Sequence, residues 1–275
     1  MPTERDGQKV KRPLTPRVLE DIGVIDGFPP APKGFAPEGD WSQSYRIWLC
    51  HGYYGLLNLE GGYLSIERRS NGGGDEFTLS VVQKFVNWEG IVQTITAEIN
   101  CRNDEISSPL RWEYSSEFRN ASGNVIPKLS TRHRGHIEGN TAILDTPGSR
   151  SEKRASQRLT ADWCIFDAVQ RLQTGTESAV NFDMLEVITA LKTDQTIRRM
   201  ESRTDRPSFY ASELTRFVQT GRGILPWEYW LDSNNRLLLA TSGDRAYILE
   251  NEAVERFGRE VTKHREGGYS WKNQL

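Results

Sequence analysis

The sequence has few cysteines, and none of them stand close together. The three residues Cys50, Cys101 and Cys164 include no C-x-x-C pair, so their spacing argues against the usual zinc cages. An odd number of cysteines cannot be a complete disulfide framework. We therefore expect three buried thiols, with one disulfide and one free thiol as the alternative.

Long apolar runs are also missing. No stretch of about 18 apolar residues occurs, so we expect no membrane span. No basic segment followed by an apolar one opens the chain. As written, the chain is expected in the cytoplasm, whereas a leader removed before Met1 would place it in the periplasm or outside the cell.

Motifs for nucleotides and serine hydrolysis are absent. The chain has no Gly-x-Ser-x-Gly elbow, no phosphate-binding loop and no dinucleotide fingerprint. The 35 basic and 37 acidic residues leave a net charge of −2, which gives no global attraction to nucleic acid. Basic residues gather at 128–158, but no aromatic residues alternate with them there, so we expect a solvated segment and no nucleic-acid partner.

Alternation of polar and apolar residues dominates from Tyr45 onward. Residues 63–68 alternate, and the Glu-Gly-Gly sequence at 60–62 before them is typical of a hairpin turn. Within 91–101, the face that carries Ile95 and Ile99 is the more apolar and is expected to face the core. Turns recur about every ten residues, which indicates a meandering antiparallel sheet.

The predicted fold is mainly β. About eleven or twelve strands would form one large antiparallel sheet, which must curve into a half-barrel or barrel to protect its edges. One or two helices are inserted. The main one is expected near 161–172, with Thr160 as its cap, where it would plug the concave side. A second short helix or turn is expected at 182–185, and 148–157 is expected to be a loop.

The chain is predicted to divide into three parts. Residues 1–44 are rich in proline and form an irregular arm, which either lies over the body, pinned by Phe35, or hangs as a disordered tether. Residues 45–252 form the curved sheet domain. Residues 253–275 form a polar tail with a short helix at 254–263.

Two segments carry a resemblance to a known family. A helical segment at 160–172 (TADWCIFDAVQRL) is followed by strands and by a late hairpin at 223–237 (GILPWEYWLDSNNRL). Their order resembles the half-β-barrel proteins of the lipoprotein-carrier type, in outline over residues 45–250. The resemblance implies an apolar or amphiphilic ligand against the concave face, and it transfers no catalytic residue.

Aromatic residues on predicted strands are candidates for ligand binding. In the segment 227–230, alternation places Trp227 and Tyr229 on one face and Trp230 on the other. Flat sugar faces and apolar molecules both bind such rings. The candidate ligand-binding residues, which would otherwise be ordinary core residues, are Trp48, Trp112, Trp227, Tyr229 and Trp230.

A second candidate site combines a histidine with tyrosines. Gly52 permits a bulge that would re-aim the side chains of its neighbours His51, Tyr53 and Tyr54. With an arginine nearby, His51 as a base and a tyrosine as a proton donor suit a lyase, hydratase or isomerase that needs no metal. The alternative is that His51 ends a strand and the tyrosines pack on the sheet.

No metal site or cofactor is expected. His133 and His136 are three residues apart, and on a strand they would face opposite sides of the sheet. The first predicted function is therefore a binding protein that holds a small apolar molecule or a glycan in an aromatic-lined concavity. The second is the metal-independent lyase, hydratase or isomerase in the same cavity. The third is an assembly module whose arm pairs with a second copy, giving a homo-oligomer.

Overall fold

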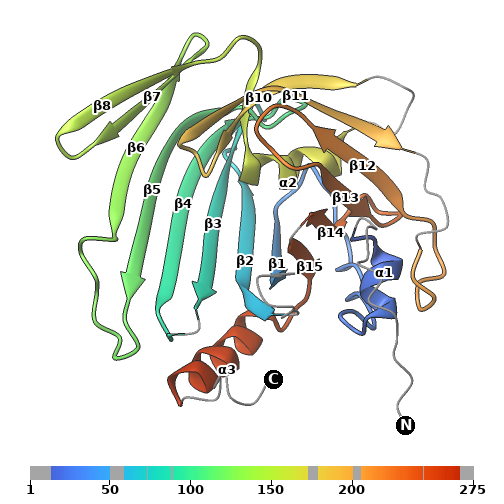
Figure 1. The fold of residues 1–275 in the computed structure, drawn as a ribbon. Helices are drawn as coiled ribbons and strands as arrows, with labels where there is room; N and C mark the ends of the chain where they lie inside the picture. Colours follow the sequence, from blue (N-terminus) through green and yellow to red (C-terminus); the bar gives the residue numbers. More distant parts are fainter. Residues whose placement is uncertain are drawn as a thin grey trace.

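A computed structural model describes residues 14–49, 59–72, 74–87, 89–172, 179–200, 206–243 and 245–266. In this part of the chain, fifteen strands pair into one sheet, and three helices accompany them (Figure 1). No helix in the described ranges has the length and apolar character to cross a bilayer. The prediction of a mainly β protein with a large curved sheet and inserted helix is confirmed.

The strand order places β1 (Trp41–Leu49) in the middle of the sheet. One half continues from it in chain order through β2 (Leu59–Ser70), β3 (Glu76–Val86), β4 (Val92–Arg102), β5 (Pro109–Arg119), β6 (Thr131–Glu138), β7 (Thr141–Thr146) and β8 (Ser149–Arg154). The other half returns to it through β9 (Leu159–Ala161), β10 (Val180–Glu186), β11 (Ala190–Met200), β12 (Thr215–Thr220), β13 (Trp227–Leu231), β14 (Leu237–Ser242) and β15 (Arg245–Leu249).

The sheet is antiparallel throughout except where β9 runs parallel to β10. It remains open, with β8 and β9 as its two edges. The β8 edge carries Arg150, Glu152 and Arg154 on exposed positions, and charges of this kind discourage pairing with another chain. The predicted loop at 148–157 is therefore partly wrong. Backbone pairing with β7 makes β8 a strand although its polar sequence has no apolar alternation.

Helix α2 (Asp162–Arg171) lies inside the curve of the sheet (Figure 1). All its side chains from Trp163 to Gln170 are buried, so the helix fills the concave side. The expected cap is wrong, since the hydroxyl of Thr160 donates to the carbonyl of Ile106 at 2.6 Å and Ala161 occupies the cap position. The second short helix predicted at 182–185 is also wrong, because that segment belongs to strand β10.

Each strand has an inner face toward α2 and an outer face. On β4, the predicted core face is confirmed, because Ile95, Ala97, Ile99 and Cys101 are all buried there. On the outer face, helix α3 (Ala253–Arg265) covers the ends of β2 to β4 and packs Phe257 against Tyr63 at 5.4 Å.

The N-terminal arm lies over the body through residues 14–40. Helix α1 (Pro16–Asp21) begins after Thr15, whose hydroxyl accepts a hydrogen bond from the Val18 amide at 3.3 Å. Further along the arm, the ring of Phe28 packs edge-on against Phe209 at 5.7 Å. Residues 14–40 therefore lie on the body, as in the first of the two alternatives for this part of the arm.

Buried arginines hold the arm by its carbonyl groups. Arg46 donates to the carbonyl of Val24 at 2.7 Å, and Arg68 donates to that of Gly39 at 2.9 Å. Arg236 donates to Pro30 in the same way at 2.8 Å. Each arginine supplies a hydrogen bond to a carbonyl group of the arm. The proline-rich arm forms no helix or strand there that would supply this bond.

The Arg68 side chain also joins the sheet to α2. Its Nε lies 2.9 Å from Oδ1 of Asp167, and the two side chains are 1% and 0% exposed. The other carboxylate oxygen accepts from Ser107 at 2.6 Å and from Arg171 at 2.9 Å. These three contacts offset part of the cost of burying Asp167, although burial still raises the pKa of its carboxyl above the ordinary value.

Replacing Arg68 by Ala is expected to destabilise the protein by about 3–5 kcal/mol, because Asp167 would lose a buried partner. Urea unfolding measures this change. The matched control is Arg69→Ala, whose side chain is 60% exposed and pairs with Glu67 at the surface. We expect at most about 1 kcal/mol there. Equal effects of the two substitutions would contradict the role given to Arg68.

Candidate functional site

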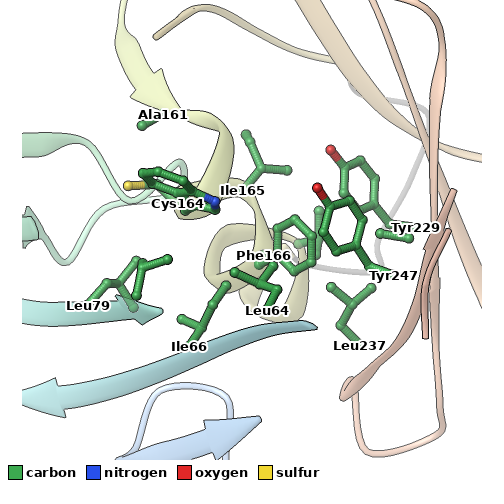
Figure 2. Close-up of a cluster of buried hydrophobic side chains, with 14 of the residues drawn as sticks. Leu64, Ile66, Leu79, Ala161, Cys164, Ile165, Phe166, Tyr229, Leu237 and Tyr247 are labelled. Atoms are coloured by element: carbon green, nitrogen blue, oxygen red, sulfur yellow. The ribbon is translucent and has the colours of Figure 1, made fainter. Parts of the chain in front are cut away.

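Five aromatic rings meet where α2 faces β1, β13 and β15. Phe166 of α2 packs edge-to-face against Tyr45 at 5.4 Å, Tyr229 at 6.3 Å and Tyr247 at 5.4 Å. Figure 2 shows Phe166 beside Tyr229 and Tyr247. The ring of Trp227 extends this group, lying 6.3 Å from Tyr229 and 5.8 Å from Tyr247. We call these five residues the aromatic cluster.

Trp227 forms the accessible margin of the aromatic cluster. Tyr45, Phe166, Tyr229 and Tyr247 are buried, whereas Trp227 is half-buried. The nearly parallel planes of Trp227 and Tyr229, 22° apart, continue the stack from the surface into the core. A molecule that reaches the cluster from solvent therefore meets the Trp227 ring first.

Buried amides lie beside these rings. The Tyr229 hydroxyl donates to Gln219 Oε1 at 2.8 Å, and the Gln219 amide lies 3.3 Å from Oε1 of Gln195. Gln195 in turn donates to the carbonyl of Arg222 at 3.1 Å. Burial raises the pKa of Tyr229 well above its usual value, so the phenol stays protonated and remains a donor.

Asp162 opens helix α2 close to Tyr229. Its carboxylate accepts hydrogen bonds from the amides of Val187 at 2.9 Å and Trp163 at 3.0 Å. Packed atoms surround the carboxyl although part of the side chain still reaches solvent. Burial raises the pKa of Asp162 to about 7, against the opposing effect of the two amides. This carboxyl can therefore exchange a proton near neutral pH.

The turn that Asp162 holds has an unusual backbone. Val187 and Ile188 have φ angles of 49° and 56°, in the left-handed region that β-branched residues rarely adopt. Ile188 is fully buried, and Val187 is bound to Asp162, so packing and a hydrogen bond together hold this conformation. Strained turns of this kind cluster at functional sites, which draws attention to the Asp162 end of α2.

The structure brings together two of the five predicted ligand-binding residues, Trp227 and Tyr229. Trp112 faces inward on the other half of the sheet, where it lies flat on Gly135. A Cβ atom at Gly135 would be 2.2 Å from the Trp112 ring. Trp230 points to the outer face, where Arg216 lies 5.2 Å above its ring.

Trp48, the fifth of these residues, also lies on the outer face. It lines a cleft of about 600 Å³ between the arm, β1 and β15. Arg46 and Arg256 both bind Glu250 in this cleft, at 2.6 and 2.7 Å. The Trp48 side chain is buried beneath the arm, so it offers little surface to a ligand.

A shallow trough of about 790 Å³ crosses the outer face of β3 to β6. Outward-pointing side chains form its walls. The floor of the trough is formed by backbone atoms. Residues on the floor, such as Tyr114 and His133, point their side chains to the inner face of the sheet, where they are buried. Both signs of charge line it, and Glu113 already pairs with Arg134 at 3.0 Å. The trough therefore has no single charge to offer a ligand.

The predicted acid-base residues His51, Tyr53 and Tyr54 lie outside the described residues. The other two histidines considered do face opposite sides of β6. His133 is buried and stacks on Tyr114 at 4.5 Å, and His136 lies outward, 3.0 Å from Glu138. No group of three or more metal-ligating side chains occurs within the described ranges.

Sequence reasoning missed Asp162, Gln219 and Tyr247 as members of this region. Tyr247 lies in the middle of the short strand β15, and Gln219 is the residue before the last in β12, so neither carries a local sign of a site. The sequence offered one signal, the acidic Asp162 at the start of the predicted helix. An acidic residue there is equally well explained by its favourable interaction with the helix N-terminus.

Comparison with known proteins supports the fold. No family model and no curated protein sequence matches the chain. Among solved structures, it is similar to the β-barrel-like protein of domain of unknown function DUF1849 from Brucella abortus. The identity is 8%, the match covers 77% of this chain and 96% of that one, and the TM-score is 0.51. This similarity shows a barrel-like fold and does not show a lipoprotein-carrier family.

The raised pKa of Asp162 predicts a pH dependence of stability. Its folded-state pKa of about 7 exceeds the ordinary 3.8, so the folded protein holds this proton more tightly. The resulting stabilisation is complete below about pH 4 and is lost as pH rises through 7. Between pH 4.5 and 8, the free energy of unfolding of the wild type should fall by on the order of 2 kcal/mol more than that of Asp162→Asn. This is about half the change expected for a fully buried carboxyl, because part of the Asp162 side chain reaches solvent.

Urea unfolding of both proteins across this pH range measures the difference. The asparagine keeps one oxygen that can accept from Val187 and loses the acceptor for Trp163, so the comparison uses the slope of stability against pH and not the absolute stability. Identical pH profiles for the two proteins would show that Asp162 ionises normally.

Proposed function

We propose that this protein binds a small apolar or glycan-like molecule at the aromatic cluster, with Trp227 as the ring that the molecule meets first. The observation that carries this proposal is the half-buried Trp227 ring, stacked on Tyr229 and close to Tyr247. A partly open stack of this kind offers a flat surface to a ligand without any change in the core.

The chemistry around the cluster fits such a ligand. Aromatic faces bind apolar groups and the C–H faces of sugars, and a few polar groups then orient the molecule. The Tyr229 hydroxyl and Gln219 are polar groups beside the rings, and Asp162 adds a carboxyl whose pKa is about 7. This combination of aromatic surface and convergent polar groups is typical of small-molecule sites.

The position of α2 sets the depth of the proposed site. The side chains from Trp163 to Gln170 fill the concave side of the sheet. A ligand would therefore bind at the edge of α2, beside β13 and β15. There it would lie next to Phe166, which belongs to the helix. Binding at this place would stabilise α2 in its present position.

The enzyme predicted from His51, Tyr53 and Tyr54 stays a prediction, because these residues lie outside the described part of the chain. The predicted pairing of two copies through the N-terminal arm also stays a prediction. In the structure the arm is engaged with its own sheet through Arg46, Arg68 and Arg236.

Fluorescence titration tests the binding proposal. The probes are cis-parinaric acid, a fluorescent fatty acid, and cellohexaose, a linear glycan. We expect one of them to bind and Trp227→Ala to weaken its binding about tenfold, which corresponds to the loss of one stacking contact. The control is Leu129→Ala, at an exposed side chain in the β5–β6 connection.

Melting temperatures of both variants show whether the fold is retained. Loss of binding in both variants, or in neither, would contradict a site at Trp227. Failure of both probes to bind the wild type would contradict the proposed ligand classes.

A further inference from the structure

Two cysteines that are distant in sequence meet in the core. Cys101 stands near the end of β4 on the inner face, and Cys164 lies in the first turn of α2. Their Sγ atoms are 3.6 Å apart, and both side chains are fully buried. In Figure 2 the sulfur of Cys164 lies on the side of α2 away from Phe166.

The two sulfurs are in van der Waals contact. A disulfide joins two sulfurs at about 2.05 Å, so the pair must approach by roughly 1.5 Å. This approach requires rotation of the two side chains or a shift of the first turn of α2 toward β4. Within the described ranges, both thiols are free in the structure.

We propose that Cys101 and Cys164 are a redox modification site, at which a reversible disulfide ties α2 to β4. The oxidant is a small disulfide such as oxidised glutathione. Two successive exchanges form the protein S–S bond, break the S–S bond of the oxidant and release two molecules of the reduced thiol. The two protein thiols lose two electrons and two protons in total.

Burial decides when this exchange takes place. A thiolate is the attacking species, and burial raises the pKa of Cys101 well above that of an ordinary thiol. The oxidant also has no path to either sulfur while α2 is seated. The bond therefore forms during folding, or when α2 lifts from β4, and once formed it resists reduction for the same reason.

The bond would act on the aromatic cluster through the helix. Phe166 follows Cys164 by two residues and contacts Tyr229 and Tyr247. A covalent tie at Cys164 restrains the helix that carries Phe166, so oxidation would reduce the freedom of the cluster to adjust to a ligand. This consequence, unlike the disulfide itself, rests on the proposed function.

The disulfide is tested first by mass spectrometry. The Cys50→Ser protein, which keeps only the proposed pair, is unfolded, reduced and refolded with reduced and oxidised glutathione, then alkylated with iodoacetamide and digested. We expect a peptide pair linked through Cys101 and Cys164, and a protein lighter by two mass units. Dithiothreitol under denaturing conditions should reverse both. Recovery of both cysteines in alkylated form would overturn the proposal.

The melting temperature of the same oxidised and reduced samples gives a second test of the disulfide. The bond closes a long loop in the unfolded chain, so the oxidised protein should melt roughly 5–10 °C higher than the reduced one. The matched control carries Cys164→Ala in addition to Cys50→Ser and should show no such difference. Where that control does not fold, the wild-type protein serves in its place, because peptide mapping locates its linkage directly. A linkage that involves Cys50 instead of the pair would also overturn the proposal.

The regulatory consequence has its own readout. Oxidised and reduced Cys50→Ser protein are titrated with both cis-parinaric acid and cellohexaose, and we expect at least a threefold difference in affinity for the probe that binds. Equal affinities would overturn the effect on binding and leave the disulfide standing. Absence of binding of both probes to both forms would contradict the proposed function, and the mass measurement would still decide the disulfide.

Discussion

The buried carboxylate of Asp167 holds helix α2 at one place inside the sheet. Arg68 from β2, Arg171 from the helix itself and Ser107 from the β4–β5 connection all contact it. An uncompensated charge at this depth would be strongly destabilising, so the helix cannot slide or rotate without breaking these contacts. Because Arg68 also binds the Gly39 carbonyl, the same side chain ties the N-terminal arm to the helix and the sheet.

The fixed position of Asp167 sets the directions of the residues before it. Successive residues of an α-helix are rotated by about 100°, so Phe166 and Cys164 point to different sides of the curve. Phe166 reaches the tyrosines of β1, β13 and β15, and Cys164 reaches Cys101 of β4. One ten-residue helix thus serves as the core of both halves of a fifteen-stranded sheet. It also leaves Trp227 as the half-buried member of the aromatic cluster.

The β architecture could be read from alternation, since a strand with one buried face repeats every two residues. This rule placed Ile95 and Ile99 in the core and separated Trp227 and Tyr229 from Trp230. It failed for β8, whose two faces are both wet, and for β10, where Phe182, Asp183, Met184 and Leu185 are all buried. Polar and apolar residues do not alternate in a strand whose two faces are both exposed or both buried. Such a segment is a strand because its backbone forms hydrogen bonds with a neighbouring strand.

The fold class, the helix in the middle of the sheet and the faces of the strongly alternating strands follow from local sequence patterns, because they depend on residues close together in the chain. Which aromatic residues meet depends on how distant segments pack. Trp48 and Trp112 satisfied the same local criteria as Trp227, yet one lies under the arm and the other against Gly135. The meeting of Tyr45 with Tyr247, and of Cys101 with Cys164, follows from strand order and from the seating of α2. Those depend on pairings between residues tens to hundreds of positions apart, which no local pattern contains.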